Sequence, residues 1–339
     1  MAIKLLVVDD SAFMRRIISD MIADITGVQI VGIARNGLDA LEIIPRLQPD
    51  IITLDMEMPK LNGIETLKII KEKFNIPVIM LSSNNKADIT IEALEIGAID
   101  FLEKPKDLKS NLTDFKLDLE MKIKSVFNNN DKKSESRNNE LTCSKSKCKA
   151  IKAVVIGAST GGPKALVYLI SRLPEDNNVP VFITQHMPKG FTTSLANRLD
   201  NESKVKVLEA QEGMVIENGV VYLAPGDFHM TLENNKIKLN SREKLHGVRP
   251  AVDYLFDSAA QIYKENLLGI ILTGMGKDGS SGMVNIKEHG GYNLAQSEKS
   301  CVVYGMPGSA VARGVVDEIL SIEELSTRLN QILRVKICI

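Results

Sequence analysis

The sequence lacks any run of about 18 apolar residues, the length that a membrane-spanning helix needs. It also lacks a secretory signal, since Asp9 and Asp10 come straight after a short apolar run and no small-residue cleavage site follows a longer one. We therefore interpret Lys4–Val8 as a buried strand. We expect a cytoplasmic protein that does not insert into a membrane.

Cysteine is scarce: the chain contains Cys143, Cys148, Cys301 and Cys338. Cys143 and Cys148 lie in a polar stretch with no second His or Cys pair nearby, which is only weak evidence for zinc. Without a secretory signal, we expect all four thiols to be reduced and to have no special role.

A large excess of charge of one sign is also missing. Residues 1–127 carry 16 Lys and Arg against 20 Asp and Glu, and residues 151–339 carry 20 of each. Neither part is strongly basic. Nucleic acid is therefore not expected as a partner.

The chain is long enough for two domains, because domains usually contain about 100–200 residues. Residues 128–150 are polar, and Leu141 is their only large aliphatic residue. Such a segment cannot bury enough apolar surface to offset the entropy lost on ordering it. We predict domains at residues 1–125 and 151–339, joined by a flexible linker at residues 126–150.

Both predicted domains alternate apolar runs with amphipathic stretches, which is typical of α/β folds with mainly parallel sheets. In the first, five β-α units predict a doubly wound sheet with strands Lys4–Val8, Gln29–Ala34, Ile51–Asp55, Val78–Leu81 and Asp100–Leu102, and helices Ser11–Asp24, Gly37–Leu47, Gly63–Phe74, Ala87–Ile96 and Ser110–Phe127. In the second, the predicted strands are Ala153–Ile156, Val181–Thr184, Val220–Ala224 and Leu268–Leu272, and the predicted helices are Pro163–Leu173, Phe191–Asp200, Val252–Tyr263, Met283–His289 and Ser321–Leu333. Val205–Leu208 and Lys236–Leu239 are interpreted as a smaller antiparallel addition.

Polar side chains follow the strands of the first domain, at the edge where open α/β sheets place their sites. Asp9 and Asp10 end the first strand and Asp55 ends the third, so three carboxylates converge there. Mg²⁺ prefers such oxygen ligands and bridges to phosphoryl oxygens. Ser82 and Lys104, after the fourth and fifth strands, supply a hydroxyl and an ammonium group. One acid alone would more often cap a helix, but the joint pattern indicates that Asp55 attacks a phosphoryl donor.

The segment Gly157-Ala158-Ser159-Thr160-Gly161 follows an apolar run and precedes Pro163, a residue favoured in the first helical turn. It fits G-x-S-x-G, a turn that exposes a serine at the edge of a sheet. Amide groups at the next helix N-terminus could stabilise an oxyanion. The glycine patterns of dinucleotide-binding and P-loop proteins both fail here. The motif alone leaves a nucleophilic Ser159 and an anion-binding turn equally open.

All four histidines lie in the second half of the chain. A nucleophilic serine needs a base, and His186 follows a predicted strand, so it lies at the same sheet edge as Ser159. We interpret His229 as a second polar wall of the cleft, and His246 and His289 as surface residues.

A third group must orient the base, and Asp278 follows another strand in a glycine-rich loop. Asp227 and Asp253 are rivals, although a turn and a helix start are simpler explanations for them. The order Ser159, His186, Asp278 differs from the orders in α/β-hydrolases, chymotrypsin and subtilisin. It predicts a distinct fold with a similar constellation.

Residues 1–125 resemble the receiver domain of response regulators, which has a flavodoxin-like fold. The resemblance rests on the acidic pair, on Asp55 before Met56-Glu57-Met58-Pro59, on Ser82, where Thr is more usual, and on Lys104-Pro105. It implies that Asp55 accepts phosphate from a chemotaxis histidine kinase. It further implies that Asp10, Asp55 and the Glu57 carbonyl hold Mg²⁺, and that Asp9, Ser82, Phe101 and Lys104 make the switch.

The second domain resembles the catalytic domain of the chemotaxis protein-glutamate methylesterases. The segments that carry the resemblance are Gly157–Gly162, Gln185–Pro188, Leu223–Gly226, Arg249–Asp253 and Leu272–Gly279. Together with the receiver and the linker, the resemblance covers essentially the whole chain. It implies that Ser159, His186 and Asp278 hydrolyse glutamate methyl esters on chemoreceptors, with amides near Thr160 and Met275 as the oxyanion hole and no cofactor. Some members of the family also deamidate glutamine.

Two other classes of protein remain as alternatives. A receiver fused to a non-catalytic ligand-binding domain would use Gly157–Gly162 only to bind an anion. A DNA-binding response regulator would carry a basic recognition helix and a compact helical output domain, which the neutral, strand-rich residues 151–339 disfavour.

Overall fold

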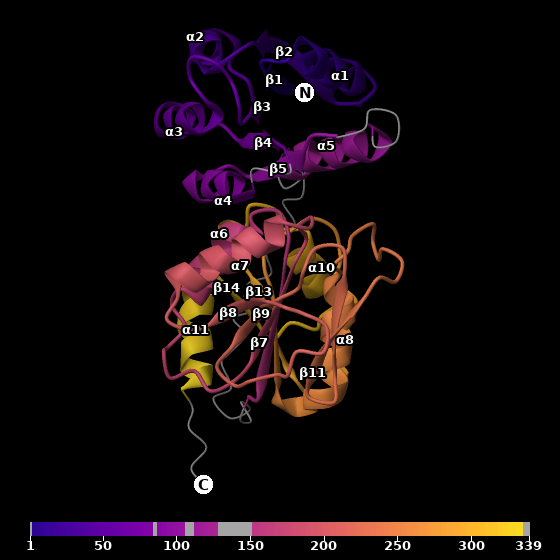
Figure 1. Cartoon of the computed structure of the whole chain (residues 1–339). Helices are drawn as coiled ribbons and strands as arrows, with labels where there is room; N and C mark the ends of the chain where they lie inside the picture. Colours follow the sequence, from indigo (N-terminus) through magenta and orange to yellow (C-terminus); the bar gives the residue numbers. More distant parts are fainter. Residues whose placement is uncertain (1, 84–86, 106–111, 128–150, 335–339) are drawn as a thin grey trace. The chain divides into compact units, whose positions relative to one another are not determined.

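The computed structural model describes residues 2–83, 87–105, 112–127 and 151–334. The chain divides into two compact units, Met1–Asn128 and Asn129–Ile339 (Figure 1). Cys143, Cys148 and Cys338, and the predicted linker beyond residue 127, lie outside the described residues, whereas Cys301 is a free thiol. No helix within the described ranges combines the length and the apolar character needed to cross a membrane.

The first unit is a five-stranded parallel sheet, as the sequence predicted, and its strand order is β2-β1-β3-β4-β5. Its strands are β1 (Ile3–Val8), β2 (Val28–Ala34), β3 (Ile51–Asp55), β4 (Val78–Ser82) and β5 (Asp100–Glu103), and its helices are α1 (Ala12–Ala23), α2 (Gly37–Leu47), α3 (Gly63–Lys73), α4 (Ala87–Ile96) and α5 (Leu112–Phe127). Helices α1 and α5 cover one face, and α2, α3 and α4 cover the other (Figure 1).

Local chemistry explains where these elements begin. Every residue of β3 and β4 is buried, as expected for strands covered on both faces. The side chains of Ser11, Asn36 and Asn62 each accept a backbone N–H at the start of α1, α2 and α3, and Glu65 completes a capping box with Asn62. β1 lies next to β3 in the sheet, so the carboxyl ends of these two strands are neighbours at the point where the strand order reverses.

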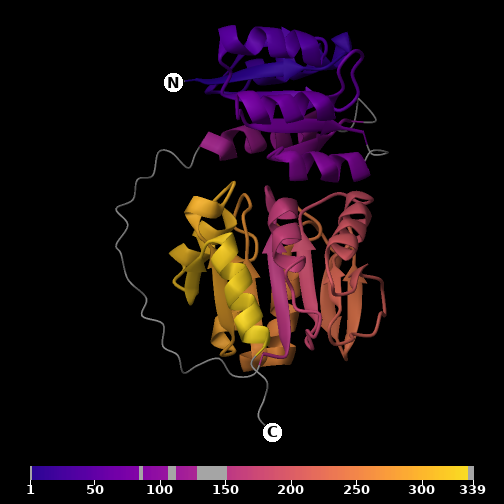
Figure 2. The same ribbon diagram turned by 90° about the vertical axis from the view of Figure 1, so that its left-hand side faces the viewer.

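The second unit has a seven-stranded parallel sheet in the order β14-β13-β12-β6-β7-β9-β8. Its strands are β6 (Ala153–Ala158), β7 (Val181–Gln185), β8 (Val207–Glu209), β9 (Val221–Leu223), β12 (Leu267–Ile271), β13 (Tyr292–Gln296) and β14 (Glu318–Leu320). Helices α6 (Gly162–Ile170), α7 (Phe191–Glu202) and α11 (Ile322–Leu333) cover one face, and α8 (Val252–Tyr263), α9 (Ser280–Glu288) and α10 (Met306–Ala312) the other (Figures 1 and 2). Among the described residues of this unit, two short 3₁₀ helices span Lys264–Asn266 and Glu298–Ser300.

Of the two segments predicted to form a smaller antiparallel addition, one is confirmed and the other is not. β11 (Lys236–Asn240) pairs antiparallel with β10 (His229–Glu233). The prediction for Val205–Leu208 was wrong, because β8 joins the main sheet and pairs parallel with β9. The Val207 amide also donates to Asp200 Oδ1 at 2.8 Å, which ties β8 to the end of α7. The sequence analysis also missed β10, β13, β14 and α10, which are short or carry buried polar residues.

The middle of the second sheet positions the site. The chain adds β7 on one side of β6 and later returns with β12 on the other side. Such a reversal leaves a crevice beyond the carboxyl ends of the central strands. Ser159 follows β6, His186 follows β7, and the loop carrying Asp278 follows β12, so all three enter the same crevice.

Candidate active site and phosphoacceptor site

The turn after β6 fixes Ser159 at the edge of the sheet. Its amide donates to the Thr273 carbonyl at 3.0 Å, and its carbonyl accepts from the Gly162 amide at 2.7 Å. Gly161 has a φ of 77°, which favours glycine, and a Cβ at Gly162 would lie 2.0 Å from Gln185 Oε1. Small residues are therefore required for this sharp turn between strand and helix.

His186 is held beside this turn by backbone and side-chain bonds. Its amide donates to the Ala158 carbonyl at 3.1 Å, and the neighbouring Gln185 side chain donates to the Ser159 carbonyl at 3.0 Å. The His186 Nε2 atom lies 2.7 Å from Asp278 Oδ2. Because Nε2 meets the carboxylate, Nδ1 is the ring nitrogen that remains for a substrate or for Ser159.

Asp278 is buried and its carboxylate is fully hydrogen-bonded. Besides His186, it accepts the amides of Val252 at 2.7 Å, of Gly279 at 2.9 Å and of Asp253 at 3.0 Å. Burial alone would raise the pKa of Asp278, but the hydrogen bonds from His186, Val252 and Asp253 outweigh it and hold the pKa below the usual value. The carboxylate is thus ionised and also caps the N-terminus of α8, which has no side-chain cap of its own.

This double attachment predicts a loss of stability when Asp278 is replaced. We expect Asp278→Ala to lower the free energy of unfolding of the second unit by about 2–4 kcal/mol, because buried amides lose their acceptor. Urea denaturation followed by circular dichroism measures this change. Ser159→Ala is the matched control and should unfold like the wild type. Equal stability of the two variants would contradict this assignment.

Neither rival acid contacts His186. Asp227 has a φ of 70° and its amide donates to the Arg249 carbonyl at 3.3 Å. Asp253 Oδ1 accepts the Gly282 amide at 2.8 Å, and its Oδ2 lies 3.3 Å from His246 Nε2. Asp278 is therefore the acid that the structure brings to His186.

The interpretation of His229 as a polar cleft wall was wrong. The ring is wholly buried, its Nδ1 accepts the Ala251 amide at 3.1 Å, and its Nε2 lies 3.1 Å from the Glu243 carbonyl. Burial lowers the pKa of His229, so the neutral ring ties the segment before α8 to the β-hairpin. His289, at the end of α9, and His246 are both exposed, as expected, and His246 also reaches Asp253.

In the first unit, the predicted acids and Lys104 meet at the edge of the sheet. One carboxylate oxygen from each of Asp9, Asp10 and Asp55 lies within 4.8 Å of the others. Lys104 Nζ lies 2.8 Å from Asp55 Oδ1 and 2.9 Å from Asp9 Oδ2. Burial raises the pKa of Asp55 to about 6, although the ion pair with Lys104 opposes this shift. Burial alone would lower the pKa of Lys104, but its ion pairs with Asp55 and Asp9 outweigh burial and raise it. A cluster made only of oxygen donors fits Mg²⁺.

The other predicted receiver residues surround this cluster in different ways. The Glu57 amide donates to Asp55 Oδ1 at 3.4 Å, and Glu57 and Asp10 line an adjacent pocket of about 690 Å³. Ser82 Oγ is buried and lies 2.7 Å from Thr90 Oγ1 on α4. Phe101 is buried in β5. The hydroxyl of Ser82 is therefore bonded to α4 in this structure.

Comparison with known proteins identifies the family of each unit. Residues 154–329 match the CheB methylesterase family, and residues 5–114 match the response regulator receiver domain. A protein-glutamate methylesterase/protein-glutamine glutaminase from Clostridium acetobutylicum is 45% identical, with 98% of each chain covered, and one from Thermotoga maritima is 43% identical, covering 97% of this chain and 98% of its own. The chain belongs to the CheB methylesterase family.

A solved structure supports the family fold of the second unit. The CheB methylesterase catalytic domain of Thermotoga maritima is 44% identical and aligns with a TM-score of 0.52, covering 54% of this chain and 99% of that domain. The seven-stranded parallel sheet is thus the fold of a CheB methylesterase domain.

Residues that sequence reasoning did not single out support the loop after β12 in this CheB domain. Thr273 Oγ1 lies 2.9 Å from the Thr160 carbonyl, and it accepts the amides of Val302 and Val303. A Cβ at Gly274 would lie 2.8 Å from Ser159 Cβ, so this loop and the serine turn are in contact. Thr273 belongs to the segment Leu272–Gly279, and this was the only signal in the sequence for its role.

The amides predicted for the oxyanion hole lie on these two touching loops. Thr160 is buried in the serine turn, and Met275 is half-buried in the loop after β12. Among the described residues, the Met275 amide has no hydrogen-bond acceptor in the protein, so it is available to a ligand. The Ser159 amide is already bonded to Thr273.

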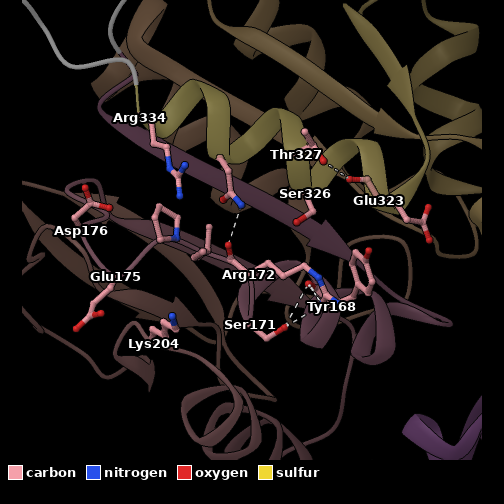
Figure 3. Close-up of a pocket in the computed structure, with 13 residues that line it drawn as sticks. Tyr168, Ser171, Arg172, Glu175, Asp176, Lys204, Glu323, Ser326, Thr327 and Arg334 are labelled. Atoms are coloured by element: carbon pink, nitrogen blue, oxygen red, sulfur yellow. Dashed lines mark hydrogen bonds between the residues drawn. The ribbon is translucent and has the colours of Figure 1, made fainter.

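A separate pocket of about 530 Å³ lies at the other end of α6 (Figure 3). Arg172 lies over the ring of Tyr168 there, and Asn330 on α11 donates to the Arg172 carbonyl (Figure 3). Since α6 begins at the serine turn, its far end is at the opposite edge of the sheet. Acidic and basic residues both line this pocket, and it takes no part in the candidate active site.

Proposed function

We propose that this chain is a phosphorylation-regulated serine esterase that hydrolyses glutamate methyl esters on chemoreceptors to glutamate and methanol. The observation that carries the proposal is the His186–Asp278 pair, 2.7 Å apart, at the same sheet edge as Ser159. The relatives named as protein-glutamate methylesterases support the choice of substrate. We place the reaction in the cytoplasm, at the receptor surface.

The reaction proceeds through an acyl-enzyme. Ser159 Oγ attacks the ester carbonyl while His186 Nδ1 takes its proton, and Asp278 stabilises the imidazolium that forms. The amides of Thr160 and Met275 stabilise the oxyanion. His186 then gives the proton to the departing methoxide, which leaves as methanol. Water attacks the acyl-enzyme with His186 again as the base, which releases glutamate and restores Ser159.

The same geometry suits deamidation of glutamine. An amide differs from the ester only in its leaving group. His186 can protonate the departing amide nitrogen, which leaves as ammonia, as it protonates the departing methoxide. The names of the relatives include protein-glutamine glutaminase, which favours this second activity. No cofactor takes part in either hydrolysis.

Asp55 is the proposed phosphoacceptor, with a chemotaxis histidine kinase as the donor. Asp10, Asp55 and the Glu57 carbonyl would hold Mg²⁺, with Asp9 beside them, and the ion would neutralise phosphoryl charge when bound. Lys104, 2.8 Å from Asp55, is placed to pair with the phosphoryl group. The Ser82 hydroxyl can leave Thr90 to bond the same group, and Phe101 is the proposed switch aromatic.

The raised pKa of Asp55 predicts pH-dependent Mg²⁺ binding. A protonated carboxyl is a poor ligand, so we expect Mg²⁺ affinity to fall by about tenfold per pH unit below the pKa of about 6 and to be constant well above it. Calorimetric titration over a pH series measures the affinity. In Asp55→Asn, binding should be weaker and lose this pH dependence. An affinity of the wild type that does not change through pH 6 would contradict the prediction.

Covalent labelling separates a hydrolase from an anion-binding module. A fluorophosphonate probe should attach to Ser159, and peptide mapping by mass spectrometry should locate it there. His186→Gln should slow the labelling, because the serine loses its base. Labelling that is absent, or that is spread over other serines, would favour the ligand-binding alternative.

A further inference from the structure

A second histidine–carboxylate pair lies behind the proposed triad. His246 Nε2 is 3.3 Å from Asp253 Oδ2, and oxygen atoms of Asp253 and Asp278 lie within 4.8 Å of each other and of His246. Asp253 is buried, with 4% of its surface exposed, whereas 29% of the His246 side chain is exposed. The pair therefore joins the buried end of the triad to solvent.

The backbone around His246 is adapted to this contact. Leu245 and Val248 exchange two backbone hydrogen bonds, so His246 and Gly247 form a two-residue turn with φ values of 54° and 82°. Asn or Gly suits such a position better than His. The turn nevertheless presents an imidazole, whose Nε2 reaches Asp253 on α8.

The two carboxylates differ in how well they are satisfied. Asp278 accepts four donors, so the cluster has no free lone pairs there to make a cation site. Asp253 accepts one amide, from Gly282, at Oδ1, and its Oδ2 lies near His246 Nε2. Burial raises the pKa of Asp253, and the charge of Asp278 raises it further. His246 is therefore the contact that can partly offset a charge on Asp253.

We propose that His246 and Asp253 are positioning residues that act through Asp278 and control how readily the His186 imidazole takes up a proton. The proposal rests on the esterase function given above. An ionised Asp253 adds negative potential at the His186–Asp278 pair and favours the imidazolium, while a protonated His246 offsets that potential. The pair thereby sets the acidic limit of ester hydrolysis.

The other charged groups around this pair are few. Asp257, one turn further along α8, interacts with Asp253 and is hydrogen-bonded to Asn285 of α9. On the other side of Asp278 lie His186 and the buried His229, and Arg249 interacts with His229. His246 is therefore the group in direct contact with Asp253 that can add a positive charge.

The test uses the full chain and the pH profile of kcat/KM for methanol release. In Asp253→Asn, the acidic limb should move to lower pH, on the order of one unit, because the imidazolium loses a neighbouring charge. In His246→Asn, which suits the turn but has a shorter side chain, the limb should move to higher pH. The double variant should follow Asp253→Asn, because His246 acts through that carboxylate. His289→Asn is the matched control and should match the wild type.

A second readout does not require hydrolysis. The chain has four histidines, so the ¹⁵N resonances of the His186 ring can be assigned with a His186→Gln variant and followed through a pH titration. The titration midpoint of His186 should move to lower pH in Asp253→Asn and to higher pH in His246→Asn, as the pH profiles do. Midpoints that coincide with the wild type in either single variant would overturn the proposal. If the midpoints move but no methanol is released by the wild type, the esterase function fails and the pairing stands.

Discussion

Replacement of Ser159 by alanine should abolish methanol release from methylated receptor membranes, lowering kcat by about 10⁴-fold or more. The reason is that the hydroxyl forms the covalent bond to the substrate, and water held by the remaining groups is a poor substitute for it. The fold should persist, because the turn is fixed by backbone atoms of Ser159 and not by its side chain. Gas chromatography of the released methanol measures the rate.

The matched control for this variant is Ser171→Ala. Ser171 lies beyond the far end of α6, in the pocket shown in Figure 3, and its hydroxyl bonds to the Tyr168 carbonyl. Its removal should leave the rate unchanged. If Ser159→Ala kept most of the wild-type rate, the nucleophile would lie elsewhere, and the turn after β6 would only bind an anion.

Phosphorylation of the receiver should raise the esterase rate about tenfold, and Asp55→Asn should remove the response completely. A small phosphodonor with Mg²⁺ replaces the kinase in this assay, so the effect depends only on this chain. The expectation follows from the joining of a phosphoacceptor unit to a hydrolase unit in one polypeptide. We propose that the unphosphorylated receiver holds the esterase back.

A fragment comprising residues 148–339 distinguishes restraint by the receiver from direct activation by phosphate. If the receiver restrains the esterase, this fragment should be faster than the unphosphorylated full chain and should not respond to the phosphodonor. Equal rates for the fragment and the full chain would remove the restraint from the mechanism. The solved catalytic domain of the Thermotoga maritima relative supports the choice of this fragment.

The sequence predicts those elements whose burial leaves a simple pattern. β6 and β12 are buried at every residue, so both appear in the sequence as apolar runs. The polar residues that follow these runs can then be recognised as candidate site residues. β13 escapes this reading because it carries Asn293, which is buried and donates to the carbonyls of Met283 and Val315. A polar residue satisfied by distant carbonyls cannot be told from a surface residue in one sequence.

The site shows the same limit. The serine turn and the glycine-rich loop could be recognised locally, but the choice of Asp278 over Asp253 depends on which carboxylate meets His186 in space. His229 was misread because its two ring partners, Ala251 and Glu243, lie 14 to 22 residues away in the chain. Pairings at this separation are set by packing and not by local pattern.

The attachment of Asp278 to α8 gives this helix a mechanical role. The carboxylate that orients His186 is held by the first two amides of α8, so the helix start and the imidazole share one anchor. α8 packs closely against α9, so a substitution that loosens this packing would also loosen the anchor without touching the cleft. It would lower kcat and leave KM largely unchanged.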